Sequence, residues 1–146
     1  MAAEFDGTSI FTAGEKDGDD LYHGDCYEIF IHPAGYTFYW EIWLSPSSLR
    51  SVVKWREKDD MISKGRLIDG QEIRMSVSKK TDNTGWILDA AIPLPRIDGR
   101  KHREWNILIA RQNYDQSLGK KTRELSSFPR LSSPDFHLLN EYFRAF

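Results

Sequence analysis

The sequence predicts an all-β protein: a sandwich of two packed antiparallel sheets with long loops, of the jelly-roll or immunoglobulin-like kind. Val, Ile, Trp, Tyr and Phe gather in short runs, and Gly, Pro, Asn, Asp and Ser separate these runs. This punctuation is typical of strands and turns in all-β domains. About seven runs are long enough to be strands, which is enough for two sheets.

The expected strands follow the apolar runs in chain order. They lie near Ala2–Phe5, Cys26–His32, Thr37–Leu44, Leu49–Trp55, Ile73–Lys79, Trp86–Ile92 and Trp105–Asn113, with a short closing strand near Tyr142–Phe146.

Two of these runs differ in their pattern. Ile73, Met75 and Val77 alternate with polar residues, which predicts a strand with one wet face. The run Trp105–Ala110 is apolar at nearly every position and is expected to be a central strand. The segment Asp82–Gly85 is expected to form the hairpin turn between Ile73–Lys79 and Trp86–Ile92, and Pro93 and Pro95 end that ladder.

Three segments lack a strand pattern: Thr12–Gly24, Glu57–Gly70 and Gln116–Asp135. Polar loops of this length within one domain are more often functional than idle. We therefore expect loop residues to contribute to any site.

Size and charge restrict the function. The 146 residues fit a single domain, 1–146, and the net charge of −2 gives no basic field to attract nucleic acid or an anionic membrane. No apolar run is long enough for a membrane span, and the first residues lack the pattern of a secretion signal. Cys26 is the single cysteine, so no internal disulfide is expected, and a buried strand position suits it best.

The chain begins with what looks like the end of a strand, Ala2–Phe5, with no hairpin partner before it. Either the domain lacks its first strands or a neighbour supplies them. An uncovered sheet edge can pair with another copy of itself, so we expect a homodimer or a piece of a longer protein.

Aromatic and acidic residues concentrate in Leu21–Pro33 and Tyr39–Pro46. A pyranose ring has C–H patches on its faces and hydroxyl groups around its edge. Flat aromatic side chains with in-plane carboxylate acceptors match both features without a cofactor. These segments indicate a carbohydrate ligand.

Five blocks of the sequence together resemble carbohydrate-binding module family 9. They are Asp25-Cys-Tyr-Glu-Ile-Phe-Ile-His-Pro33, Tyr39-Trp-Glu-Ile-Trp-Leu-Ser-Pro46, Gly85-Trp86 with Ala91–Leu94, Trp105–Arg111, and Phe136-His137 with Tyr142-Phe143. They occur in the family's order and cover most of the chain after residue 20. By this resemblance, we expect this sequence to lack the family's N-terminal strands. The resemblance implies a β-sandwich that binds sugars and belongs to polysaccharide-degrading enzymes.

The resemblance also implies a site. In the family, a sugar at a chain's reducing end lies between two aromatic rings, which correspond to Tyr22 and Phe136. The family's best-known binders have Trp at both places, so weaker binding or a different ligand is implied. Glu28 would contact sugar hydroxyls, with Glu41 and Trp43 nearby and His137 beside Phe136.

Glu28 and Glu41 each lie among apolar neighbours and must find partners or stay protonated. If the hairpin loop is Pro33–Tyr36, the two acids are directly opposite, about 5 Å apart. A three-residue loop would place them on opposite faces. Arg111 could pair with either acid, as a sugar contact or as a structural ion pair.

The run Asp17-Gly-Asp-Asp20 offers the clustered carboxylates that calcium prefers, so Asp17, Asp19 and Asp20 are candidate ligands for structural calcium. A solvated acidic loop explains the same residues, and no other cofactor is expected. The four histidines have no metal-ligand spacing.

We predict a non-catalytic sugar-binding domain that targets a polysaccharide-degrading enzyme. The resemblance implies an extracellular or periplasmic location. Three alternatives remain: a glycoside hydrolase using Glu28 and Glu41, a structural domain with a decayed site, and a haem or electron-transfer module with Met61 or Met75 and a histidine as axial ligands.

Overall fold

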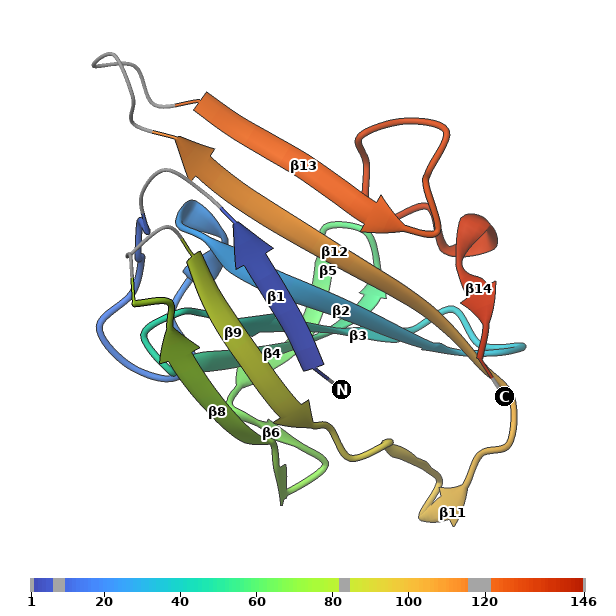
Figure 1. Cartoon of the computed structure of the whole chain (residues 1–146). Helices are drawn as coiled ribbons and strands as arrows, with labels where there is room; N and C mark the ends of the chain where they lie inside the picture. The colour runs from blue at the N-terminus through green and yellow to red at the C-terminus, as the bar shows by residue number, and fades with distance from the viewer. Residues whose placement is uncertain (1, 7–9, 82–84, 116–121, 146) are drawn as a thin grey trace.

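Two antiparallel sheets pack face to face (Figure 1). The computed structural model describes residues 2–6, 10–81, 85–115 and 122–145. Within these ranges the larger sheet has seven strands: six in the order β13-β12-β2-β3-β4-β5, and β14 paired with β12. The smaller sheet has the order β1-β9-β8. The predicted all-β antiparallel sandwich is confirmed.

The larger sheet consists of β2 (Cys26–Pro33), β3 (Tyr39–Leu44), β4 (Arg50–Glu57), β5 (Asp60–Gly65), β12 (Trp105–Asp115), β13 (Thr122–Phe128) and β14 (Phe143–Arg144). The smaller sheet consists of β1 (Ala2–Asp6), β8 (Arg74–Lys79) and β9 (Gly85–Ala91). Two small hairpins are β6 (Leu67–Ile68) with β7 (Gln71–Glu72), and β10 (Arg96–Ile97) with β11 (Arg100–Lys101). Single 3-10 turns are η1 (Leu21–His23) and η3 (Leu139–Glu141).

The expected strands are all present, with ends shifted by up to two residues. Two strands of the larger sheet were missed, as were the two small hairpins: β5 lies inside Glu57–Gly70, and β13 lies inside Gln116–Asp135. Both are edge strands of the larger sheet. An edge strand needs no continuous apolar face, so a polar sequence can still form one.

Side-chain alternation gives the larger sheet two different faces. Its inner face packs on the smaller sheet through a core that includes Ile29, Ile42, Trp86, Leu88 and Trp105. Its outer face carries two other apolar clusters, one around Phe30 and one around Leu21 and Trp43. A single sheet thus supports the core on one side and a second set of buried side chains on the other.

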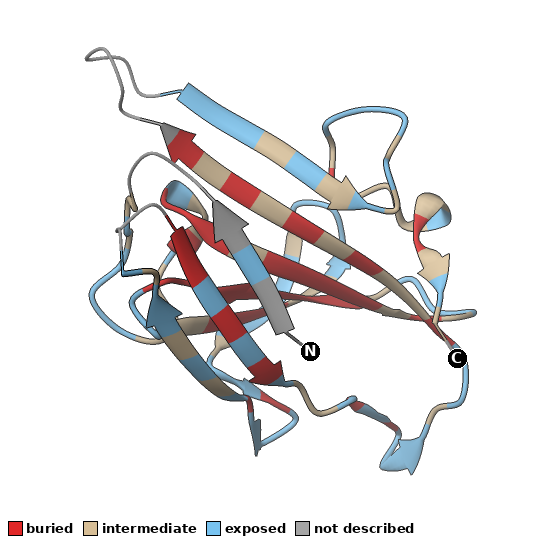
Figure 2. Cartoon of the chain, in the orientation of Figure 1, coloured by how far each residue is buried: buried red, intermediate tan, exposed pale blue. Residues whose placement is uncertain are grey.

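The central position of β12 is confirmed, because it pairs with β2 on one side and with β13 and β14 on the other. Figure 2 shows buried positions repeating along β12 and β9. Trp86 and Trp105, predicted as core residues, are 2% and 1% exposed. The β8–β9 hairpin is confirmed too, although residues 82–84 of its expected turn are outside the described residues.

β1 is an edge strand of the smaller sheet and pairs with β9. Pairing of its outer edge with a second copy stays a prediction. In the described part of the chain, no helix has the length and apolar character needed to cross a membrane.

The long loop before β2 is tied to the sheets by a buried carboxylate. Asp25, 3% exposed, accepts the backbone N–H of Phe11 at 2.8 Å and that of Tyr114 at 2.7 Å. Burial raises the pKa of Asp25, and these two N–H groups partly offset that rise. Gly24 permits the close approach of this loop, since a Cβ there would lie 2.5 Å from the backbone N of Ala13.

We predict that Asp25→Ala lowers the free energy of unfolding by on the order of 3 kcal/mol, because it leaves two enclosed N–H groups without their acceptor. Urea denaturation measures this loss. Asp89→Ala, at an exposed position of β9, serves as the control and is expected to change stability by less than about 0.5 kcal/mol. Equal losses in both variants would contradict the assignment.

Candidate functional site

The candidate site is a cavity of about 590 Å³ over the outer face of the larger sheet. Its floor comes from alternating residues of β12, β2, β3 and β4, including Gln112, Glu28, Phe30, Glu41 and Val53. The loop before β2 and the segment 134–137 form walls on either side. The volume is within the range of about 300–1,000 Å³ that is usual for small-molecule sites.

Two tryptophans hold the carboxylate of Glu41. The indole N–H of Trp43 donates to Oε1 at 2.8 Å, and that of Trp55 donates to Oε2 at 2.7 Å. Trp43 lies two residues along β3 from Glu41, and Trp55 lies on β4, so the same sheet face carries all three. This fixes the carboxylate plane beside two aromatic rings.

Glu28 is held at one oxygen only. Its Oε1 accepts the side-chain amide N–H of Gln112 and the thiol of Cys26, the latter at 3.4 Å. In the described part of the chain, no protein donor bonds Oε2. Because Glu28 lines the cavity, this oxygen can accept a hydrogen bond from a bound molecule.

Both acids are buried, at 1% exposure for Glu28 and 5% for Glu41. Burial raises the pKa of Glu28 to about 7, against the opposing effect of its Gln112 and Cys26 hydrogen bonds. Burial, followed by the nearby Glu28 carboxylate, raises the pKa of Glu41 to about 8. The pair therefore holds at least one proton near neutral pH.

Aromatic rings surround the acids. Tyr22, on η1, lies 5.1 Å from Trp43 between ring centroids, at a tilt of 53°. His137 lies edge-on to Trp55 at 6.0 Å, and its Nδ1 is 2.6 Å from the hydroxyl of Tyr39. Burial lowers the pKa of His137, which favours the neutral ring.

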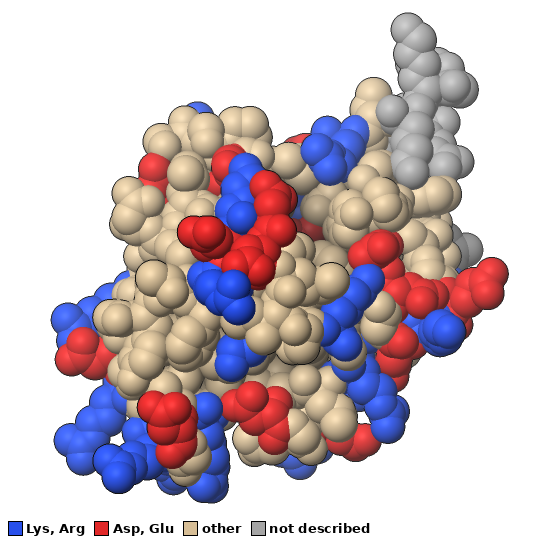
Figure 3. All heavy atoms as spheres, turned by 180° about the vertical axis from the view of Figure 1, so that it is seen from behind, with Lys and Arg blue, Asp and Glu red and all other residues tan. Residues whose placement is uncertain are grey.

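Charged side chains of both signs lie around the cavity mouth. Lys58 pairs with Asp135 at 2.7 Å, and Lys64 pairs with Asp20 at 2.5 Å. The side of the molecule turned away from the viewer in Figure 1 likewise carries acidic and basic side chains interspersed (Figure 3). No single sign dominates this side.

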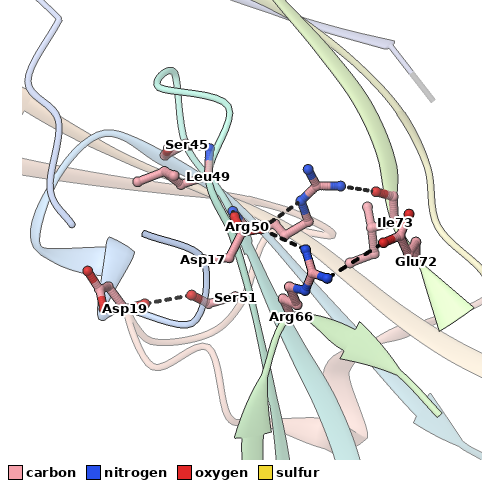
Figure 4. A network of polar contacts seen from close by, with 9 residues as sticks. All are labelled: Asp17, Asp19, Ser45, Leu49, Arg50, Ser51, Arg66, Glu72 and Ile73. Carbon is pink, nitrogen blue, oxygen red and sulfur yellow. Dashed lines mark hydrogen bonds and ion pairs between the residues drawn. The ribbon is translucent and has the colours of Figure 1, made fainter. Parts of the chain in front are cut away.

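A polar network anchors the loop that carries Tyr22 (Figure 4). Asp17 accepts the backbone N–H of Arg50 at 3.0 Å and lies 3.6 Å and 3.8 Å from the guanidinium groups of Arg50 and Arg66. The hydroxyl of Ser51 donates to the backbone carbonyl of Asp19 at 2.6 Å. These contacts tie the loop to β4 and so position η1 at the cavity wall.

The structure brings most of the predicted site residues together. Six of the seven line the one cavity: Tyr22, Glu28, Glu41, Trp43, Phe136 and His137. Phe136 is only 9% exposed and packs edge-on against Phe30 at 6.1 Å. It therefore offers the cavity little ring surface, in contrast to the open stacking ring that the sequence suggested.

The structure places Arg111 outside this cavity. Arg111 alternates with Gln112 along β12 and lies on the other face of the sheet, where it donates to Asn113 Oδ1 at 2.9 Å. Gln112 occupies the cavity-facing position beside Glu28 that the prediction gave to Arg111. Arg123, on the missed strand β13, supplies a basic side chain to the cavity.

The structure also corrects the register of the two acids. The pairing places Glu28 opposite Trp43 and Glu41 opposite Phe30. The acids thus share a face but are diagonal neighbours, with Cα atoms about 7–8 Å apart by strand geometry. The loop between β2 and β3 is longer than expected, which shifts the pairing by two residues.

Each of the three acids of the proposed calcium site has a protein partner in the structure, and calcium binding there stays a prediction. Asp17 turns to Arg50, Asp19 accepts the backbone N–H groups of Glu15 and Lys16, and Asp20 pairs with Lys64. Among the described residues, no group of three or more His, Cys, Asp or Glu side chains converges to hold a metal ion.

Comparison with known proteins identifies the fold. No family model and no curated protein sequence matches the chain. The structure is similar to the crystal structure of a "putative carbohydrate-binding protein" from Bacteroides uniformis, with a TM-score of 0.71 and 13% sequence identity. The match covers 97% of this chain and 69% of the other. At this identity the likeness shows a shared fold, and membership of carbohydrate-binding module family 9 stays a prediction.

The raised pKa values make stability depend on pH. The folded state binds protons at Glu28 and Glu41 that the unfolded chain, with a glutamate pKa near 4.5, releases. This stabilisation is complete below pH 4.5 and is lost as pH rises through about 7 and 8. The lowered pKa of His137 acts in the opposite direction only below about pH 6.5.

We therefore predict that the free energy of unfolding falls by on the order of 2 kcal/mol between pH 6.5 and pH 8.5. Urea denaturation across this interval measures the fall. The double variant Glu28→Gln/Glu41→Gln is expected to flatten the curve. A wild-type curve that is flat, or that rises with pH, would show that the acids are not buried as described.

Proposed function

We propose that this protein binds a carbohydrate, without altering it, in the cavity over the outer face of the larger sheet. The proposal rests on one observation: carboxylate acceptors and aromatic rings lie together in this cavity. Glu28 and Glu41 provide acceptors on the floor, and Tyr22, Trp43 and Trp55 provide aromatic surface beside them. Carboxylates match the hydroxyl edge of a pyranose, and rings match its C–H faces.

The binding groups suit a molecule that is both polar and flat. Glu28 Oε2 accepts no protein hydrogen bond in the described part of the chain and can take one from a sugar hydroxyl. Gln112 and Arg123 add donors from β12 and β13. A purely apolar ligand would leave these groups without water or partners, at a cost.

The finer role comes from the resemblance to carbohydrate-binding module family 9. On that basis we propose that the domain recognises the end of a glycan chain and directs a polysaccharide-degrading enzyme outside the cytoplasm. Tyr22 would stack on the sugar, while Phe136 would support the opposite wall from within its apolar cluster.

A glycoside hydrolase is the second candidate, because two buried carboxyl groups with raised pKa values share one cavity. However, both Glu41 oxygens are already bonded to indoles, and the diagonal register disfavours the separation of about 5 Å that a retaining enzyme needs. Turnover of aryl glycosides that disappears in Glu28→Gln would support hydrolysis over simple binding.

We predict that Tyr22→Ala weakens binding more than tenfold, which corresponds to about 1.4 kcal/mol, because it removes a stacking surface without opening the core. A glycan array first identifies a bound oligosaccharide, and calorimetry then compares the variants. Tyr36→Ala, at an exposed tyrosine outside this cavity, is the matched control and is expected to bind normally. Unchanged affinity in Tyr22→Ala would remove this residue from the site.

A further inference from the structure

The cavity is lined by more acidic than basic side chains, and the two most buried acids lie on its floor. Four acidic side chains line the cavity: Asp20, Glu28, Glu41 and Asp135. Three basic side chains do so: Lys58, Lys64 and Arg123. The three basic side chains do not lie beside Glu28 and Glu41, so the excess of acidic groups is concentrated at these two residues.

Glu28 and Glu41 are bonded only to neutral donors. These donors are an amide, a thiol and two indoles, from Gln112, Cys26, Trp43 and Trp55. Within the described ranges, no Lys, Arg or His nitrogen lies within ion-pair distance of either carboxylate. A buried acid without a cationic partner is costly when ionised.

The basic side chains around the cavity mouth already have other partners. Lys58 and Lys64 pair with the rim acids Asp135 and Asp20, and Arg123 donates to the side-chain oxygen of Gln112 at 3.5 Å. Arg123 acts on Glu28 only at longer range. The described residues therefore give the two buried acids no cationic partner that would favour their ionised forms.

We propose that the cavity takes a sugar carrying a free amino group, with its ammonium bound between Glu28 and Glu41. This inference rests on the proposed sugar-binding function and specifies its ligand class. The ammonium donates to the open Oε2 of Glu28 and neutralises the repulsion between the two acids. Trp43 and Trp55 also line the cavity, and the faces of indole rings attract cations.

The molecule contains a precedent for a cation on these rings. The ammonium of Lys64 lies 5.5 Å from the centroid of Trp43 while it pairs with Asp20. A ring face, a carboxylate and an ammonium thus already combine at the cavity rim. On the floor, Trp43 and Trp55 likewise lie beside a carboxylate, that of Glu41.

Three β-1,4-linked tetrasaccharides test the proposal, since they differ only at position 2: the glucosamine, glucose and N-acetylglucosamine forms. Calorimetry at pH 7 is expected to show that the glucosamine form binds at least tenfold tighter than the other two. Glu28→Gln keeps the side chain's shape and is expected to reduce this preference to less than threefold. Circular dichroism and urea denaturation confirm that the variant is folded.

Glu124→Gln is the matched control, because it removes a carboxylate from β13 between two cavity-lining residues while pointing away from the cavity. It is expected to keep the full preference. Equal binding of the glucose and glucosamine forms, or a preference that survives both Glu28→Gln and Glu41→Gln, would overturn the inference and leave sugar binding intact. Failure of all three tetrasaccharides to bind, with no binder on a wider glycan array, would overturn the sugar site as well.

Discussion

The burial of Glu28 and Glu41 on the outer face of the larger sheet is the constraint on which the site depends. Neither acid can be ionised there without donors, and the chain supplies an amide, a thiol and two indoles in place of basic groups. These hydrogen bonds hold Trp43 and Trp55 beside Glu41 and leave Oε2 of Glu28 open to the cavity. The same arrangement raises the pKa of both acids, so a ligand that donates hydrogen bonds or positive charge would compete with protons for the same oxygens.

Strand alternation allows one sheet to serve two purposes. In β2, Ile29 and Ile31 face the smaller sheet, while Glu28 and Phe30 face the cavity. In β3, Ile42 belongs to the first face, and Glu41 and Trp43 belong to the second. The inner face provides stability through apolar contact, so the outer face can hold polar groups that reduce stability. The loop before β2 closes one wall, because Asp17 and Asp25 anchor it to β4 and β12.

Six of the seven site residues predicted from local pattern and family resemblance line one cavity. The sequence was also sufficient for the fold class and for the apolar strands, because these depend on local pattern. It failed where the answer depended on pairing. The register of β2 with β3 decides which residues lie opposite the two acids, and the register of β2 with β12 decides whether Arg111 or Gln112 faces the cavity. A shift of one residue reverses each answer. The polar edge strands β5 and β13 have no apolar signature, so Arg123 was missed with its strand. Phe136 resembled a loop residue, yet it is buried because Phe30 and Tyr142 lie beside it.

The most direct test of the account is the behaviour of the five indole N–H signals in an NMR titration with a binding oligosaccharide. Trp43 and Trp55 donate to Glu41 at the cavity, whereas Trp86 and Trp105 lie in the core between the sheets. The account predicts that the signals of Trp43 and Trp55 shift on binding and that those of Trp86 and Trp105 stay in place. Binding that leaves Trp43 and Trp55 unmoved would contradict it, because the sugar would then lie away from the two acids.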